Sequence, residues 1–66
     1  MNINARPVEV MIQQLSVLVV DDNPFMRNLV RGTLTNIGVT KIFEARDGIA
    51  ALEMIRSATP DVVVLD

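Results

Sequence analysis

Three aspartates at the ends of apolar segments are the residues of this chain whose type and spacing point to chemistry. Asp21 and Asp22 directly follow the apolar run 17–20. Asp66 directly follows the apolar run 62–65. Two carboxylates about 5 Å apart repel each other by roughly 3 kcal/mol at an effective dielectric constant of about 20. If the fold brings all three together, a bound cation is the simplest way to neutralise them.

The ligands available for that cation are hard oxygens, because the sequence contains no histidine and no cysteine. Oxygen donors favour Mg²⁺, with Mn²⁺ or Ca²⁺ as substitutes. Mg²⁺ usually combines one or two carboxylates with water and phosphate oxygens, so this set of ligands predicts phosphoryl chemistry. In that chemistry one carboxylate can be the nucleophile that forms an aspartyl phosphate, while the metal neutralises the developing charge.

Composition limits the class of protein further. A chain of 66 residues holds one domain at most, and an apolar content of 50% excludes an intrinsically disordered chain. Six basic against eight acidic residues give a net charge of −2, which excludes the basic surface that nucleic-acid binding needs. The sequence shows neither an export signal nor a stretch of about 20 apolar residues that could span a membrane. We therefore expect a cytoplasmic protein that contacts neither nucleic acid nor membrane.

Three apolar segments predict the strands that would position the aspartates. The continuous runs 17–20 and 62–65 are rich in β-branched residues and lack alternation, which is typical of strands buried on both faces of a parallel sheet. The segment 41–45 has mixed polarity and predicts a shorter strand at the edge of the sheet.

Two helices are predicted between these strands. The first begins at Pro24, with Asn23 as its capping residue, and ends at Gly38, which can adopt the left-handed conformation. Its apolar residues recur at helical spacing, and these are Met26, Leu29, Val30, Leu34 and Ile37. The second helix follows the turn 47–48 and ends before Pro60. We expect Met26 and Met54 to fill the core.

The order β-α-β-α-β predicts an α/β fold with a parallel sheet. Because the first and third strands are the ones buried on both faces, the first strand lies in the middle and the strand order is 2-1-3. Right-handed crossovers then place the two helices on opposite faces of the sheet. The gap between the carboxyl ends of the first and third strands is a topological switch point, where open α/β sheets bind ligands. Asp21, Asp22 and Asp66 are all expected there.

The first fourteen residues stand apart from this pattern. We interpret residues 1–14 as a loosely ordered polar leader, because Pro7 and the mixed polarity support no regular element. A short helix at Val8–Leu15 is the alternative. The domain itself is then expected over residues 15–66.

Three segments, taken in order, resemble the receiver domains of two-component response regulators. They are Val17–Pro24, Glu44–Leu52 and Pro60–Asp66. The resemblance covers residues 16–66 and implies a flavodoxin-like fold. Any one segment alone would be weak evidence, but the three in this order are specific.

The resemblance also implies roles for individual residues. Asp66 would be the phosphoacceptor, and Asp21 and Asp22 would hold Mg²⁺ together with it. The phosphoryl donor would be a histidine kinase or a histidine phosphotransfer protein that carries phosphohistidine. The start of the first helix would be the surface on which this partner docks, with Asn23, Pro24, Arg27 and Arg31.

The chain departs from the family pattern in its length, since receiver domains run to about twice this ordered length. Family members carry a metal-binding carbonyl two residues past the phosphoacceptor, then a Ser or Thr and a Lys at the ends of later strands. These 66 residues contain none of them, so we expect the N-terminal half of a receiver, impaired as an isolated chain. We expect a regulatory module, not an enzyme. The alternative is a non-catalytic fragment that only binds a kinase; an aspartyl phosphohydrolase is disfavoured because its acids usually follow an Asp-x-Asp pattern.

Plainer roles exist for several of these residues. The acids at 21 and 22 could belong to a capping turn, but Asn23 already supplies the cap, so they are surplus to it. Asp47 and Asp61 are expected to be turn or cap residues. Arg27 and Arg31, spaced i, i+4, would most simply form a solvated helix face.

Overall fold

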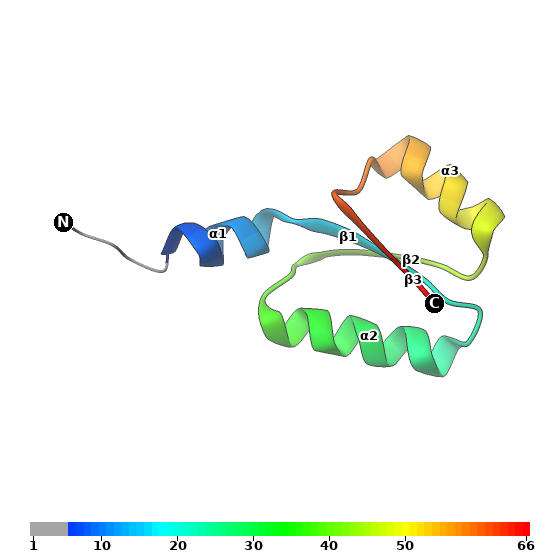
Figure 1. Ribbon diagram of the computed structural model, residues 1–66, viewed down its shortest axis with the longest axis horizontal. Helices are drawn as coiled ribbons and strands as arrows, with labels where there is room; N and C mark the ends of the chain where they lie inside the picture. Colours follow the sequence, from blue (N-terminus) through cyan, green and yellow to red (C-terminus); the bar gives the residue numbers. More distant parts are fainter. Residues whose placement is uncertain (1–5) are drawn as a thin grey trace.

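The computed structural model describes residues 6–66, which form three strands and three helices (Figure 1). In chain order the elements are α1 (Arg6–Gln14), β1 (Ser16–Val20), α2 (Pro24–Ile37), β2 (Lys41–Ala45), α3 (Gly48–Ala58) and β3 (Val62–Leu65). The predicted alternation of strand and helix from β1 to β3 is confirmed. Within the described residues no helix is long and apolar enough to cross a membrane.

The three strands form one parallel sheet in the order β2-β1-β3, which confirms the predicted order 2-1-3. Val20, the last residue of β1, pairs with Ala45 of β2 on one side and with Leu65 of β3 on the other. The carboxyl ends of all three strands are therefore level. Polar residues that follow β1 and β3 must emerge at the same edge of the sheet.

Strand β1 is covered on both faces, as its unbroken apolar sequence predicts. Leu18 is 0% exposed and belongs, with Val20, to a cluster that Ala51 of α3 completes. Val17 and Val19 point the other way and form, with Val39, a second cluster, which we call the cluster beneath α2. Partly buried residues of α2 pack against it. Figure 1 shows α2 and α3 on opposite sides of the sheet, so the predicted placement of the helices is confirmed.

Strand β3 differs from its prediction, because most of its side chains are exposed. Val62, Val63 and Leu65 remain accessible, and only Val64 packs against the cluster beneath α2. Within residues 6–66 β3 pairs with β1 alone, so its other edge has no neighbouring strand. An apolar, β-branched edge of this kind favours association with other chains.

Helix α2 has the predicted boundaries. The side-chain oxygen of Asn23 accepts hydrogen bonds from the backbone N–H groups of Phe25 and Met26, and Pro24 occupies the first helical position. Gly38 ends the helix in the left-handed conformation, with φ 117°, and its N–H donates to carbonyls of the last turn. These caps satisfy backbone groups that the helix itself leaves free.

Helix α3 is capped by Asp47, whose carboxylate accepts a hydrogen bond of 2.8 Å from the N–H of Ala50. The expected turn or cap role of Asp47 is confirmed. The helix ends at Thr59, which lies in the left-handed region at φ 44°, one residue before Pro60. Left-handed backbone is uncommon for a β-branched residue, so this turn is strained.

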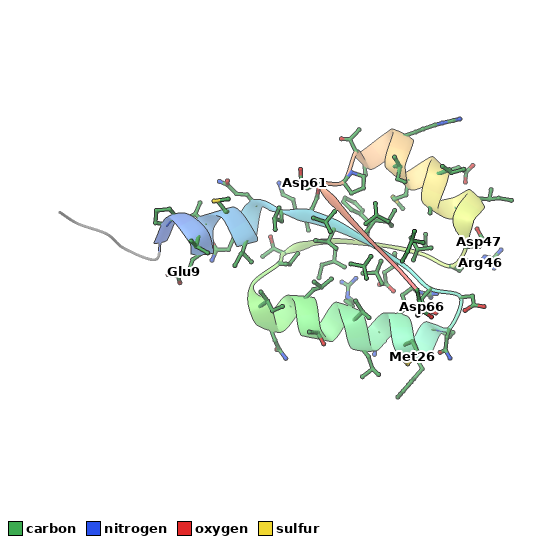
Figure 2. The ribbon with its side chains drawn as sticks, viewed as in Figure 1. Glu9, Met26, Arg46, Asp47, Asp61 and Asp66 are labelled. Atoms are coloured by element: carbon green, nitrogen blue, oxygen red, sulfur yellow. The ribbon has the colours of Figure 1, made fainter. Side chains whose placement is uncertain are left out.

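Not every apolar residue of α2 reaches the core. Val30 and Leu34 pack against the sheet, but Met26 is 43% exposed, and Figure 2 shows its side chain directed away from the sheet. The prediction that Met26 fills the core is wrong, because a sheet of three strands covers only one stripe of the helix. Met54 of α3 does pack against the core.

Helix α1 corrects the interpretation of residues 6–14 as a loosely ordered leader, and agrees with the alternative of a short helix. Ile12 packs against the cluster beneath α2, and the Thr40 hydroxyl donates a hydrogen bond of 2.9 Å to the carbonyl of Gln13. These contacts with the rest of the domain stabilise a helix whose sequence alone is ambiguous. The part of the predicted leader at residues 1–5 lies outside the described residues.

Two glycines of α2 and its cap are expected to respond oppositely to the same substitution. Gly38→Ala should destabilise the protein by about 1–2 kcal/mol, because an L-residue is strained at this φ. Gly32→Ala should stabilise it by about 0.5–1 kcal/mol, because Gly32 lies inside the helix and an added Cβ meets no atom within 4 Å. Chemical unfolding followed by circular dichroism measures both. Equal effects at the two positions would contradict the assigned backbone geometry.

Candidate functional site

The carboxyl ends of β1 and β3 bring the backbones of Asp21 and Asp66 side by side. The N–H of Asp66 donates to the carbonyl of Val20 at 3.3 Å, and Asp21 and Asp66 directly follow Val20 and Leu65, the last pair in register between the two strands. Because side chains alternate along a strand, Asp21 shares the face of Val19 and Asp66 shares the face of Val64. Both of these valines belong to the cluster beneath α2. The two aspartates therefore leave the sheet at the same edge.

The N–H, the carbonyl and the carboxylate of Asp21 each have a hydrogen-bond partner. It is only 6% exposed, and its carboxylate accepts a hydrogen bond of 2.9 Å from the N–H of Asn23. Its own N–H donates to the carbonyl of Ala45 at 3.1 Å, and its carbonyl accepts from the Arg27 guanidinium at 2.9 Å. A buried charge is stabilised only when it is hydrogen-bonded in this way. The structure thus fixes one acid at the predicted switch point.

Asp22 and Asp66 are exposed at the same end of the sheet. Asp22 lies in the loop between β1 and α2, so it is free of the strict alternation of the strand. Their exposure leaves these carboxylates accessible to a ligand from solvent.

The donors at this edge are carboxylate oxygens, the type that Mg²⁺ prefers. Within residues 6–66, however, no three acidic side chains are gathered into a cluster that could hold a metal ion by themselves. Mg²⁺ does not need such a cluster, since it usually keeps several waters and takes one or two protein carboxylates. The chemistry of the donors fits Mg²⁺, and the roles of Asp21, Asp22 and Asp66 as its ligands stay a prediction.

A network of one glutamate and two arginines joins α2 to β2 below this edge. The two carboxylate oxygens of Glu44 accept hydrogen bonds from Arg27 Nε at 3.0 Å and from Arg31 at 2.8 Å. The side chain of Arg27 is 21% exposed and that of Arg31 is 46% exposed. The two arginines are therefore ion-paired, where the sequence indicated a solvated helix face.

Sequence reasoning missed the partner of these arginines. Glu44 is the single acidic residue of β2, and it lies in register with Val19 of the buried strand. An acidic residue inside an otherwise apolar segment, with arginines spaced i, i+4 on the adjacent helix, is the signal that could have indicated the network.

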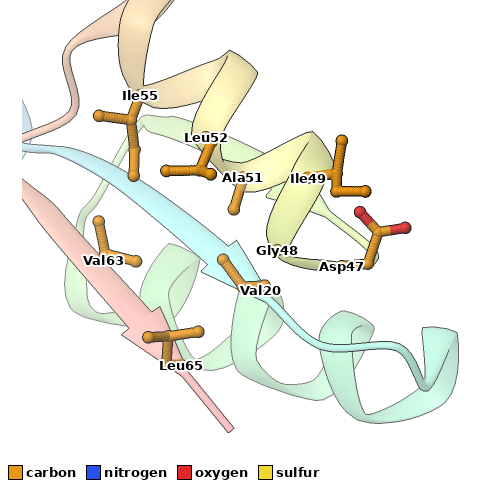
Figure 3. Close-up of a pocket in the computed structure, with 9 residues that line it drawn as sticks. All are labelled: Val20, Asp47, Gly48, Ile49, Ala51, Leu52, Ile55, Val63 and Leu65. Carbon is orange, nitrogen blue, oxygen red and sulfur yellow. The ribbon is translucent and has the colours of Figure 1, made fainter.

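An apolar groove of about 550 Å³ lies between α3 and β3 (Figure 3). Its apolar lining comes from both elements and from β1, and includes Val20, Ile49, Leu52, Ile55, Val63 and Leu65. The α3 residues Ile49, Leu52 and Ile55 thus face an open groove instead of a closed core. Asp47 lies at the margin of the groove, on the α3 cap.

The opposite end of the sheet is held by Asp61. Its carboxylate accepts hydrogen bonds from the Ser16 N–H at 2.9 Å and from the Ser16 hydroxyl at 3.2 Å, and its N–H donates to the Ser16 carbonyl. Chiefly the backbone hydrogen bond, and then the hydroxyl, lowers the pKa of Asp61 below its ordinary value of 3.8. Figure 2 shows Asp61 and Asp66 at opposite ends of β3. Asp61 therefore does not belong to the candidate site at the carboxyl ends of the strands.

Comparison with known proteins identifies the pattern at these residues. Residues 17–66 match the family model of the response regulator receiver domain. The chain is 44% identical over 55 residues to a protein-glutamate methylesterase/protein-glutamine glutaminase of Pyrococcus horikoshii, which covers 82% of this chain and 15% of that protein. It is 38% identical over 52 residues to the chemotaxis protein CheY of Pseudomonas aeruginosa, which covers 79% of this chain and 42% of that protein.

The matched region therefore spans less than half the length of either relative. No solved structure is significantly similar to this chain.

The Asp61 contact predicts a pH dependence of stability. Because the pKa of Asp61 is lowered in the fold, its ionised form stabilises the native state above the ordinary pKa, and this contribution is lost as pH falls through the lowered value. We expect Asp61→Asn to have a lower Tm than the wild type at neutral pH, with the gap closing below about pH 4. Ser16→Ala keeps the backbone N–H and should retain part of the pH dependence. A gap in Tm that is constant from pH 7 to pH 3 would contradict the proposed role of the charge.

Proposed function

The chain belongs to the response regulator receiver family of two-component signalling, and from that premise we propose that Asp66 accepts the phosphoryl group. One observation carries this proposal. Asp66 directly follows β3, beside the end of β1 and at the edge where the predicted switch point lies, and its side chain is open to solvent. A phosphoryl donor can reach an exposed carboxylate there, while the buried Asp21 beside it is held by hydrogen bonds.

The proposed reaction is a transfer from phosphohistidine to a carboxylate. An oxygen of Asp66 attacks the phosphorus atom, the P–O bond forms, the P–N bond breaks, and the imidazole leaves as the neutral base after taking up a proton. Water later attacks the phosphorus atom of the aspartyl phosphate, which releases inorganic phosphate and restores the carboxylate. Asp21 and Asp22 would hold Mg²⁺ with Asp66, and the ion, when bound, neutralises charge on the transferring oxygens.

The partner follows from this reaction. A histidine kinase or a histidine phosphotransfer protein supplies the phosphoryl group, in the cytoplasm. We propose that it docks at the start of α2, with Asn23, Pro24, Arg27 and Arg31. In support, this end of α2 follows the candidate site directly and exposes the large apolar side chain of Phe25. Since both arginines are already paired with Glu44, they would contribute a shaped surface more than free charge.

We further propose that residues 15–66 form the N-terminal part of a receiver and are impaired in isolation. Two uncovered surfaces support this proposal, namely the apolar groove beside α3 and the outer edge of β3. Further strands and helices of a receiver would cover both. The proposed regulatory role belongs to the receiver domain alone.

The phosphoacceptor proposal is tested with acetyl phosphate and Mg²⁺ in the intact protein that carries these residues. We expect mass spectrometry to find a single phosphorylation, lost in Asp66→Asn and retained in Asp61→Asn, whose side chain lies at the other end of β3. Phosphorylation that persists in Asp66→Asn would overturn the proposal. Kinase binding that survives both Asp66→Asn and removal of Mg²⁺, without any phosphorylation of the wild type, would favour an interaction-only role.

A polypeptide of residues 1–66 alone is expected to be marginally stable, because a core of this size rarely supplies more than about 3–5 kcal/mol. The exposed β3 edge should also make it self-associate. Analytical ultracentrifugation should show concentration-dependent oligomers, and thermal unfolding should be broad. A monomer that unfolds in one sharp, cooperative transition would be incompatible with the proposed impairment.

A further inference from the structure

We propose that Arg27 is a positioning residue for the candidate site, and that it acts through the peptide group between Asp21 and Asp22. The inference rests on the proposed function, because it concerns how the two acids are presented to Mg²⁺. Arg27 itself touches neither the metal nor the phosphoryl group in this mechanism. Its contact is with the backbone that carries the acids.

Arg27 joins three parts of the fold, two through its side chain and one through its backbone. One guanidinium nitrogen donates to the carbonyl oxygen of Asp21 at 2.9 Å, and Nε donates to Glu44 of β2 at 3.0 Å. The backbone N–H of Arg27 donates to the carbonyl of Asn23 at 2.9 Å, within the first turn of α2. A planar guanidinium fork can satisfy two acceptors in fixed directions, which the single ammonium group of a lysine cannot.

The Asp21 carbonyl matters because of where it lies in the chain. It belongs to the planar peptide unit that links Asp21 to Asp22, so its direction determines where the next Cα lies. The N–H of Asp21 is held by Ala45 and its carboxylate by the N–H of Asn23. Arg27 holds the remaining polar group, the carbonyl, and thereby limits rotation of the peptide that carries the exposed Asp22.

Arg31 provides a matched comparison. It carries the same charge, lies one turn further along α2 and contacts the other oxygen of Glu44 at 2.8 Å. Among the hydrogen bonds of the described residues it has none to the 21–23 segment, unlike Arg27. Both arginines repel a divalent cation, so removing either charge should by itself tighten Mg²⁺ binding. If Arg27 positions the acids, its removal should instead weaken Mg²⁺ binding. The direction of the change in Mg²⁺ affinity therefore distinguishes positioning from charge repulsion.

The experiment measures Mg²⁺ binding by isothermal titration calorimetry in the intact protein, with Mg²⁺ as the only ligand. We expect Arg27→Gln to weaken binding by about tenfold, in the range found when outer partners of metal ligands are removed. Arg31→Gln should bind Mg²⁺ as tightly as the wild type or more tightly. Arg27→Lys keeps the charge and should restore only part of the affinity. Thermal unfolding of each variant identifies any change in overall stability.

A second measurement tests the positioning role of Arg27 in the absence of metal. In ¹⁵N relaxation of the metal-free protein, the amide order parameter of Asp22 should fall in Arg27→Gln and stay unchanged in Arg31→Gln. Glu44→Gln removes the charged anchor of Arg27 but no arginine. Because loss of a negative charge weakens Mg²⁺ binding by itself, only the order parameter of this variant is informative. It should fall at Asp22, as in Arg27→Gln, and it covers the case in which Arg27→Gln does not fold.

Two results are decisive in different ways. Tighter or equal Mg²⁺ binding in folded Arg27→Gln, with an unchanged order parameter at Asp22, would overturn the positioning role. A wild type that does not bind Mg²⁺ would instead overturn the metal part of the proposed function. In that case the order parameter alone decides whether Arg27 positions the loop.

Discussion

Strand β1 has strand neighbours on both edges and helices on both faces, and this burial constrains the rest of the fold. Its last four residues, 17–20, are all buried, so they must be apolar up to the point where the chain leaves the sheet. The first polar residue after them therefore emerges at the edge, and the parallel neighbour β3 delivers its own next residue to the same height. The position of Asp21 beside Asp66 is a consequence of burying β1. It needs no special loop.

Much of the architecture could be predicted because its signals are local. The unbroken apolar run of β1, the Asn23 cap and Gly38 as a left-handed stop each report a physical requirement of a single element. Features that depend on contacts between distant segments could not be obtained in this way. Helix α1 depends on Ile12 reaching the core, and the exposure of Met26 depends on how wide the sheet is.

The candidate site shows the same division. Its location followed from topology, yet Asp21 and Asp22 are adjacent in sequence and have opposite environments, one buried and hydrogen-bonded and the other exposed. Charge and residue type are identical, so composition and spacing cannot distinguish the two. The distinction arises from the last hydrogen bond of β1 to β2 and from Arg27, a residue whose spacing indicated only a solvated face.

Thr59 has a consequence for how the domain opens and closes. A β-branched residue in left-handed backbone costs free energy, and here it caps α3 through a hydrogen bond from its N–H to the carbonyl of Ile55. Two residues further on, Asp61 and Ser16 donate hydrogen bonds to each other, and these bonds fix the chain before β3 to the start of β1. Detachment of β3 would break the hydrogen bonds between Asp61 and Ser16, so the strained turn and the strand are expected to open together.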